Sequence, residues 1–297
     1  MYYLLSLLTG ILVSVMIVSN GGLTAGYGVY TATVIIHITG LLLITALMLL
    51  KGERPKHKIQ NWVFYTGGAV GVATTVFNNF AYGRISVSAI LALGLFGQTI
   101  FGLFIDQYGL IGMSKHPFRK EKIAGVLLIF AGIVSMITEF AFLAVGAAFL
   151  SGIFTIVSRT TNARLSDATT LRVSTFYNYV IGLLTAVPVL LLFGRGELPF
   201  AGVNASVNPF YYFGGVLGAC IVLLGNMTVT KISAFYLSIL LFVGQVFSGI
   251  LIDALLSGAF SVRNLIGGML VTLGLCVNLF LDRKKHAAVS PNATEAR

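Results

Sequence analysis

Two short apolar stretches of the chain carry the same pair of polar residues. Residues 97–106 read GQTIFGLFID and residues 244–253 read GQVFSGILID, so Gln and Asp recur eight residues apart in a chain with four residues of each type. The amides can donate and accept hydrogen bonds, and the carboxylates can take up a proton. In an apolar environment such groups cost free energy unless they are paired, so each marks either a contact between helices or a path for a polar solute. The four residues are Gln98, Asp106, Gln245 and Asp253.

One histidine and several asparagines also lie inside or beside apolar runs. Histidine side chains ordinarily titrate near neutral pH, so His37 could carry a coupled proton. The alternative is a buried ring bonded to a backbone carbonyl. Asn20, Asn79, Asn162 and Asn226 lie near the ends of apolar runs. We interpret them as gate or solute-binding positions, and the alternative is that they end helices, since Asn is tolerated there. Asp106 and Asp253 could likewise couple protons, but their places near the ends of runs favour a structural role.

The composition places these residues in a membrane. Hydrophobic residues make up 57% of the 297 residues, charged residues make up 9%, and the mean hydropathy is +0.94. A soluble domain has about 25% charged residues. Runs of about 20 apolar residues, each sufficient for a transmembrane helix, recur along the chain. We predict an all-α membrane protein with a turn at Glu139 and ten spans, at residues 4–20, 28–50, 61–82, 87–106, 123–138, 140–158, 172–193, 210–230, 234–256 and 264–281.

The basic residues predict how the spans are oriented. If alternate loops are assigned to the two faces, 16 of the 19 Lys and Arg fall on one face, and the other three, Arg84, Arg195 and Arg263, fall on the opposite face. Basic loops are retained in the cytoplasm, so both termini are expected there, which requires an even number of crossings. The net charge of +10 is therefore attributed to loop orientation, and no nucleic-acid partner is expected.

The polar pair belongs to an internal repeat. At an offset of 147 residues, segments 84–106 and 231–253 share eight identities in 23 positions. Apolar bias alone does not align Gln, Asp and several loop residues together. Further matched pairs are Asn79 with Asn226 at this offset, and Asn20 with Asn162 and Gly40 with Gly182 at an offset of 142.

The repeat predicts the domain organisation. One five-span repeat is expected over residues 1–138, a second over 139–281, and a basic, disordered cytoplasmic tail over 282–297. Because five is odd, the second repeat must lie upside down in the membrane. Inverted repeats are typical of secondary transporters, whose solute sites lie near the midplane. Gln98 is about 12 Å along a helix from Asp106, so this Gln and its counterpart Gln245 are predicted near the bilayer centre, as candidate solute-binding residues.

These motifs carry a family resemblance. The segment from Ile85 to Gly132, with its GQ, its Asp and the run GVLLIFAG, resembles the YdcZ-like inner-membrane branch of the drug/metabolite transporter superfamily. The NARL turn after the sixth span and NYVIG in the seventh, which contains Asn178, are similar to it as well. The resemblance implies a fused two-repeat carrier with a central cavity among spans 1, 3, 4, 6, 8 and 9, and it adds Asn178 to the candidate solute-binding residues. Ile36 of the first half occupies the position of Asn178 in the second half. A site assigned by symmetry can therefore be functional in one half alone.

We therefore predict a secondary transporter that needs no cofactor or metal and exports a small organic metabolite or drug-like solute by alternating access. It is expected in a bacterial inner membrane, in contact with lipid, and a homodimer is left open. The scarcity of charge within spans favours a neutral or zwitterionic solute. A lipid flippase or scramblase of the same architecture is the alternative. A membrane-embedded enzyme is disfavoured because the His and carboxylate residues are scattered and form no H-x-x-H motif.

Overall fold

The computed structural model describes residues 1–55, 61–112, 120–137, 141–197, 208–229 and 234–289, and the regular structure of these residues is helical. Short 3-10 helices precede or follow some of the α-helices: η1 (Trp62–Tyr65), η2 (Leu110–Gly112), η3 (Arg195–Glu197) and η4 (Pro209–Phe213). The α-helices are α1 (Tyr2–Tyr27), α2 (Val29–Leu50), α3 (Gly67–Ala81), α4 (Val87–Tyr108), α5 (Lys122–Met136), α6 (Phe142–Ala168), α7 (Leu171–Phe193), α8 (Gly214–Val229), α9 (Ala234–Ser257) and α10 (Val262–Val289).

Seven of the described helices are long and apolar enough to cross a membrane: α1, α2, α4, α6, α7, α9 and α10. The others are shorter, since α3 and α5 have 15 residues and α8 has 16. At the α-helical rise, α3 and α8 are about 23 Å long, and the 3-10 helices before them add about 8–10 Å. The sum is close to the ~30 Å hydrocarbon core of a bilayer. Asn61 and Asn208, at equivalent positions of the repeat, cap these two 3-10 helices with their side chains.

Two helices extend further than the sequence predicted. α1 continues to Tyr27 instead of ending at residue 20, and α6 continues to Ala168 instead of residue 158. The turn predicted after the sixth span is therefore wrong, because its first residue, Asn162, lies inside α6. The polar residues do not end these helices because each one packs against a glycine of the other half. Asn20 lies against Gly214, and Asn162 lies against Gly67.

The C-terminal end also differs from the prediction. α10 continues to Val289, so residues 282–289 of the tail that was expected to be disordered are helical. Residues 290–297 and the predicted turn at Glu139 lie outside the described residues.

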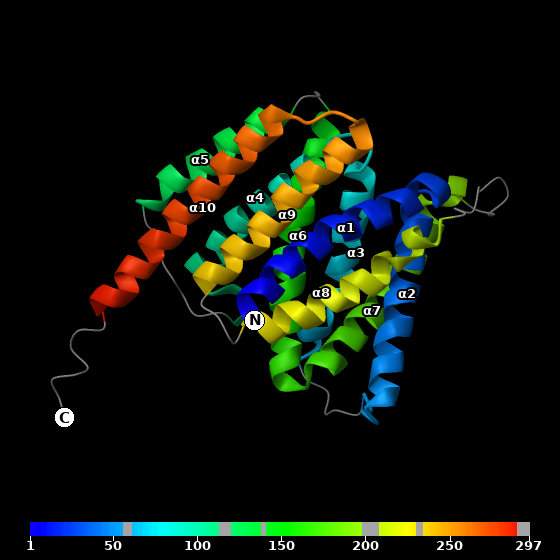
Figure 1. The fold of residues 1–297 in the computed structure, drawn as a ribbon. Coiled ribbons are helices and arrows are strands. Elements are labelled where there is room, and N and C mark those ends of the chain that lie inside the picture. Colours follow the sequence, from blue (N-terminus) through cyan, green and yellow to red (C-terminus); the bar gives the residue numbers. More distant parts are fainter. Residues whose placement is uncertain (56–60, 113–119, 138–140, 198–207, 230–233, 290–297) are drawn as a thin grey trace, which may run out of the picture.

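The two halves of the chain interlock. α1 packs against α8 and α9, and its counterpart in the repeat, α6, packs against α3 and α4. Counterparts also pack on each other: α5 on α10 and α2 on α7, which lie at opposite sides of the bundle in Figure 1, and α4 on α9. These pairs are antiparallel, as Gly125 faces Gly274 and Gly132 faces Gly267 along α5 and α10. Helices that correspond in sequence therefore make corresponding contacts.

Glycines permit the closest of these contacts. Gly10 on α1 lies against Gly244 on α9. At the equivalent crossing of α6 on α4, Gly152 lies against Gly94, and Gly97 lies against the backbone of Phe149 and Ile153. A Cβ at Gly152 would overlap the backbone of α4, so only glycine allows the two helices to approach this far. In lipid the hydrophobic effect contributes little to association between helices. Close van der Waals packing at small residues stabilises such crossings instead.

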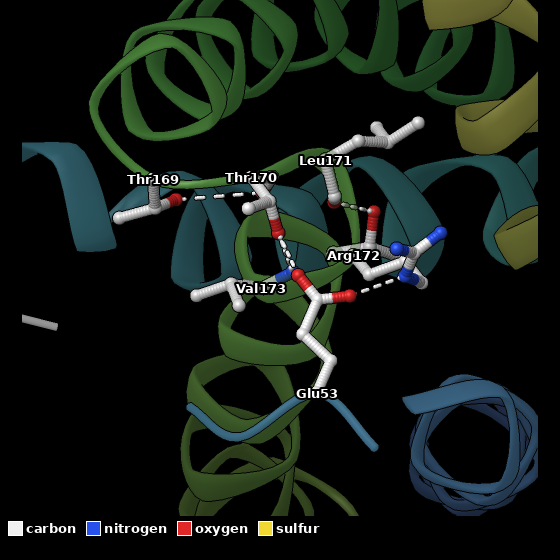
Figure 2. A network of polar contacts seen from close by, with 7 residues as sticks. Glu53, Thr169, Thr170, Leu171, Arg172 and Val173 are labelled. Carbon is white, nitrogen blue, oxygen red and sulfur yellow. Dashed lines mark hydrogen bonds and ion pairs between the residues drawn. The ribbon is translucent and has the colours of Figure 1, made fainter. Parts of the chain in front are cut away.

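Carboxylates that follow one helix bind the first turn of another. Figure 2 shows Glu53, which follows α2, accepting hydrogen bonds from Thr170 and Arg172 at the start of α7. At the opposite end of this helix pair, Glu197, which follows α7, accepts from the backbone N–H groups of Tyr30 and Thr31, at 3.1 Å and 2.7 Å, in the first turn of α2. Glu197 therefore satisfies free N–H groups of α2, and each carboxylate opposes the dipole of the helix that it approaches. The two glutamates therefore hold α2 and α7 in register.

Candidate functional site

A cavity of about 110 Å³ lies where the two halves meet, between α1, α2, α3, α7 and α8. Its apolar walls include Met16 and Ile36 and the glycines of α3 and α8. None of the described lining residues is Asp, Glu, Lys or Arg. The polar side chains that line the cavity are Asn20, His37, Thr74, Thr75, Asn78, Asn178 and Tyr179.

His37 and Tyr179 form one wall of the cavity from equivalent positions of the two halves. They are related by the 142-residue offset, and their ring centroids lie 5.9 Å apart in an edge-to-face arrangement. The Nδ1 atom of His37 lies 2.8 Å from the carbonyl oxygen of Thr33, so Nδ1 carries the hydrogen and donates it. Tyr179 donates its hydroxyl to the carbonyl oxygen of Gly215 at 3.1 Å. The backbone bond expected as the alternative role of His37 is therefore present, and the ring also borders the cavity.

Asn162 and Asn178 bond to each other at the edge of the cavity. The side-chain N–H of Asn162 donates to Oδ1 of Asn178 at 2.8 Å and to the hydroxyl of Ser158 at 3.3 Å. Ser158 in turn donates to the carbonyl oxygen of Gly67 at 2.7 Å. The amide of Asn162 is thus engaged in holding α6 against α7 and α3.

Asn20 is in a different situation although it corresponds to Asn162. The residues that correspond to Ser158 and Asn178 are Met16 and Ile36, which offer no hydrogen-bonding side chain. Asn20 is 6% exposed, and its Oδ1 atom is buried with no hydrogen-bond partner among the described residues. Its side chain lies against Gly214, another lining residue of the cavity.

Of the other predicted amides, Asn79 and Gln245 are not among the described lining residues of the cavity. Asn79 is buried and donates to the Thr33 hydroxyl at 3.3 Å, which joins α3 to α2. Asn226 belongs to α8, but its side chain lies outside the described part of the structure. Gln245 is 3% exposed on α9, beside Gly10 of α1, and it is not among the described lining residues.

Gln98 forms a polar contact that the sequence analysis did not predict. Its Oε1 atom accepts a hydrogen bond from the guanidinium of Arg159 at 3.2 Å, and its Nε2 donates to the carbonyl oxygen of Gly94 at 3.3 Å. Arg159 was assigned to a loop, but it lies within α6 and its side chain is exposed. The residue that corresponds to Arg159 in the first half is Ile17, which is buried. An arginine within a candidate span is therefore present in one half alone.

Asp253 binds the start of a neighbouring helix. Its carboxylate accepts hydrogen bonds from the backbone N–H groups of Val87 and Ser88, at 2.7 Å and 2.9 Å, and from the Ser88 hydroxyl at 2.5 Å. These contacts cap the first turn of α4. The side chain of Asp106, its counterpart, lies outside the described part of the structure. No group of three or more His, Cys, Asp or Glu residues that could hold a metal ion occurs among the described residues.

Several site residues were missed from the sequence. Thr74, Thr75 and Tyr179 line the cavity, and Ser158 positions Asn162, but hydroxyl groups are common in membrane helices and carry no distinct signal. The offset of 142 residues was available as a signal for Tyr179, because it aligns this residue with His37.

One known protein family matches both halves of the chain. The family model described as "Putative inner membrane exporter, YdcZ" matches residues 1–135 and, a second time, residues 143–277. No curated protein matches the chain. A solved structure titled only "Crystal structure of protein" is 16% identical, with a TM-score of 0.64, and the match covers 95% of this chain and 98% of that chain. At this identity the likeness shows the fold alone.

Proposed function

Because the chain belongs to the YdcZ family of inner membrane exporters in the drug/metabolite transporter group, we propose that it exports a small organic solute by alternating access. The observation that carries the proposal is the cavity between the two halves. Polar side chains from both halves line it, and the described lining residues include no catalytic carboxylate or metal ligand set. A polar cavity at the interface of two repeats is the usual place for a carrier's solute site.

The helix contacts support ten spans in two inverted repeats. Counterpart helices pack antiparallel, and each contact of α1 on the second half has its equivalent in α6 on the first. A twofold axis in the membrane plane produces this arrangement, since it reverses the direction of every helix that it relates. The short helices α3 and α8 complete the spans together with η1 and η4. Both termini are proposed to lie in the cytoplasm, as the basic loops indicate.

A difference between the halves supports alternating access. Ile17 and Gly21 on α1 are buried, with Ile17 packed against Val87 of α4. Their counterparts on α6, Arg159 and Ala163, are exposed. We propose that this conformation is closed on the α1 side and open on the α6 side. In the alternative state, each half would adopt the conformation that the other half has here. That change would close the α6 side and open the α1 side.

We propose different roles for the candidate residues. Asn20, Asn178 and His37 contact the solute, because they line the cavity. Asn79 and Asn162 hold the helices around it, as their hydrogen bonds indicate. Gln98 borders the open side together with Arg159, and its counterpart Gln245 takes this place in the exchanged conformation. Asn226 is proposed to mirror Asn79. Proton coupling, where it occurs, is assigned to His37, whereas Asp253 and its counterpart Asp106 are proposed to cap helices.

The proposal is tested with a variant that fills the cavity. A Cβ at Gly71 would make ordinary contacts, 3.5 Å from the Ser158 hydroxyl and 3.9 Å from Oδ1 of Asn178, so Gly71→Leu fills the cavity without a backbone clash. Gly102→Leu is the matched control, since no heavy atom lies within 4 Å of a Cβ there. Bacteria that express each protein at equal membrane levels are compared by mass spectrometry of the solutes in the medium.

We expect at least one small solute to accumulate outside cells with the wild type and the Gly102→Leu control, but not with Gly71→Leu. Identical solute profiles for all three proteins would contradict the proposal, provided that the variants unfold at the wild-type temperature. Purified protein in liposomes is also tested with a fluorescent phospholipid. Rapid movement of this lipid between leaflets, blocked by Gly71→Leu, would support a flippase instead.

A further inference from the structure

Arg159 carries a positive charge within a candidate membrane span. By the α-helical rise it lies about 14 Å from the C-terminal end of α6, and its side chain is exposed. A charged side chain within a span is costly in lipid, so it ordinarily faces the interior of the bundle or a water-filled path and marks the route of an ion or solute. Arg159 is therefore a candidate for contact with the transported solute.

The repeat indicates where Arg159 lies relative to the proposed path. Its counterpart Ile17 is 4% exposed and packs with Val87 and Leu91 of α4, on the side that we propose to be closed. Arg159, which is bonded to Gln98 of α4, occupies the equivalent position on the open side. It therefore stands where the path has to close in the alternative state.

The neighbours of the two positions differ as well. Val13 and Val18 pack against the cluster of Ile17, and their counterparts in α6 are Thr155 and Thr160. The first half thus forms a contact of valine and isoleucine side chains, whereas the second half has two hydroxyl groups and a charge at the equivalent positions. Apolar side chains alone therefore cannot close the path on the α6 side.

The guanidinium of Arg159 keeps donors available. It donates to Oε1 of Gln98 at 3.2 Å, and Nε2 of Gln98 donates to the carbonyl oxygen of Gly94 at 3.3 Å, which orients the amide. A guanidinium has five N–H donors, arranged in a fork that matches a carboxylate or a phosphate. The amide of Gln98 is neutral, so its contact leaves the charge of Arg159 uncompensated.

No carboxylate neutralises Arg159 within the described part of the chain. Asp167 on α6 and Asp106 on α4 lie about 12 Å along their helices from Arg159 and Gln98, respectively. Three further carboxylates bind the first turns of helices: those of Glu53, Glu197 and Asp253. The charge of Arg159 is therefore available to an anion that comes from outside the protein.

Closure of the α6 side changes the environment of this charge. In the alternative state, Arg159 would occupy a position as buried as that of Ile17 here. A buried guanidinium without a counter-charge is strongly destabilising, whereas a carboxylate or phosphate bound to it compensates the charge. The α6 side therefore closes more readily when the bound solute brings an anionic group to Arg159.

We infer that Arg159, oriented by Gln98, binds a carboxylate or phosphate group of the solute, so that the exported class is an organic anion or zwitterion. The inference rests on the proposed function and names the chemical class that it transports. Ser158, the residue before Arg159, has its hydroxyl 3.5 Å from the Cβ position of Gly71, a lining residue of the cavity. The uncharged part of the solute is assigned to that cavity, whose described lining residues include no Asp, Glu, Lys or Arg.

Three probes that share a phenyl ring test the inference: benzoate, phenylphosphonate and benzamide. Benzamide has the shape of benzoate but no charge. Binding of each probe to the full-length protein, in nanodiscs of phosphatidylcholine, is measured by saturation-transfer NMR titration. We expect benzoate or phenylphosphonate to bind at least about tenfold more tightly than benzamide, because only the oxyanions compensate the charge of the guanidinium.

Three variants locate the preference. Arg159→Gln removes the charge and should bring the affinities of the three probes to within about twofold of one another. Arg159→Lys retains the charge but not the fork, so it should retain part of the preference. Arg54→Gln, at an exposed position of the same predicted face, is the matched control and should bind the probes as the wild type does. Thermal unfolding of each variant checks that it is folded.

Four outcomes would overturn the inference. Binding of benzamide as tight as that of both oxyanions would remove the need for charge, and failure of both oxyanions to bind would exclude the anionic class. A preference for oxyanions that persists in Arg159→Gln would place the anion elsewhere. Phosphatidylglycerol that co-purifies with the wild type but not with Arg159→Gln, measured by mass spectrometry of the extracted lipids, would assign the site to a lipid headgroup.

The export comparison decides the proposed function separately. Solutes that accumulate in the medium with the wild type but not with Gly71→Leu support transport, and we expect them to carry a carboxylate or phosphate group. If they carry none, transport stands and the inference fails. If no solute accumulates, the proposed function fails, while the preference among the probes still decides whether Arg159 binds anions.

Discussion

The substitution Asp253→Asn tests whether the carboxylate of Asp253 stabilises the fold or couples protons to transport. The carboxylate accepts three hydrogen bonds in the first turn of α4, from two backbone N–H groups and from the Ser88 hydroxyl. In Asp253→Asn the remaining oxygen can serve Val87, but the new NH₂ group faces the N–H of Ser88, so that donor loses its acceptor. One charged hydrogen bond is worth about 1.5–3 kcal/mol, and the charge at the helix N-terminus contributes about 0.3–1 kcal/mol more.

We therefore expect Asp253→Asn to reduce the free energy of unfolding by about 2–4 kcal/mol. A change of this size lowers the Tm by roughly 4–16 °C in a protein of this length. The measurement is thermal unfolding in nanodiscs, combined with export of the solute identified by mass spectrometry at two transmembrane pH gradients. Asp167→Asn, at an exposed position of α6, is the control for loss of charge and should unfold at the wild-type temperature.

The reasoning is refuted if Asp253→Asn unfolds at the wild-type temperature while export loses its dependence on the pH gradient. That result would identify Asp253 as a coupling carboxylate. Lower stability with the pH dependence retained would identify it as a helix cap.

Three further predictions concern helix packing and the open side of the bundle. Gly152→Ala should reduce the free energy of unfolding by about 1–3 kcal/mol, because its Cβ overlaps the backbone of α4. The control Gly146→Ala, in the same helix, should unfold at the wild-type temperature, because a Cβ there meets no heavy atom within 4 Å. Equal unfolding temperatures for the two variants would contradict this prediction. Glu197→Gln should cost about 0.5–2 kcal/mol through the weaker cap on α2, measured by thermal unfolding, and an unchanged Tm would show that the cap is dispensable. Gln98→Ala should slow export of the identified solute with little change in Tm, since its partner Arg159 is exposed; an unchanged rate would make this hydrogen bond a helix contact alone.

The sequence by itself determined the class of protein and its duplication. Hydropathy and composition are sums over local residues, so they report the membrane helices without knowledge of the packing. The offsets of 142 and 147 residues identified the two halves, and the family model matches the chain in two segments as well. The same offsets align Gly10 with Gly152 and Gly97 with Gly244. In the structure these glycines lie at two equivalent helix crossings, where each one faces the backbone of the opposing helix.

The tertiary structure alone decided which polar residues share a site and where helices end. Gln98 and His37 were both candidates, yet only His37 borders the cavity, because the rotation and crossing of helices determine which face each one presents. α1 and α6 continue past Asn20 and Asn162 because a glycine on the opposite helix accommodates each side chain. The two asparagines are identical in type and equivalent in the repeat. Their difference arises from residues on neighbouring turns and helices, since a hydrogen bond is satisfied by groups brought together in space and not by spacing along the chain.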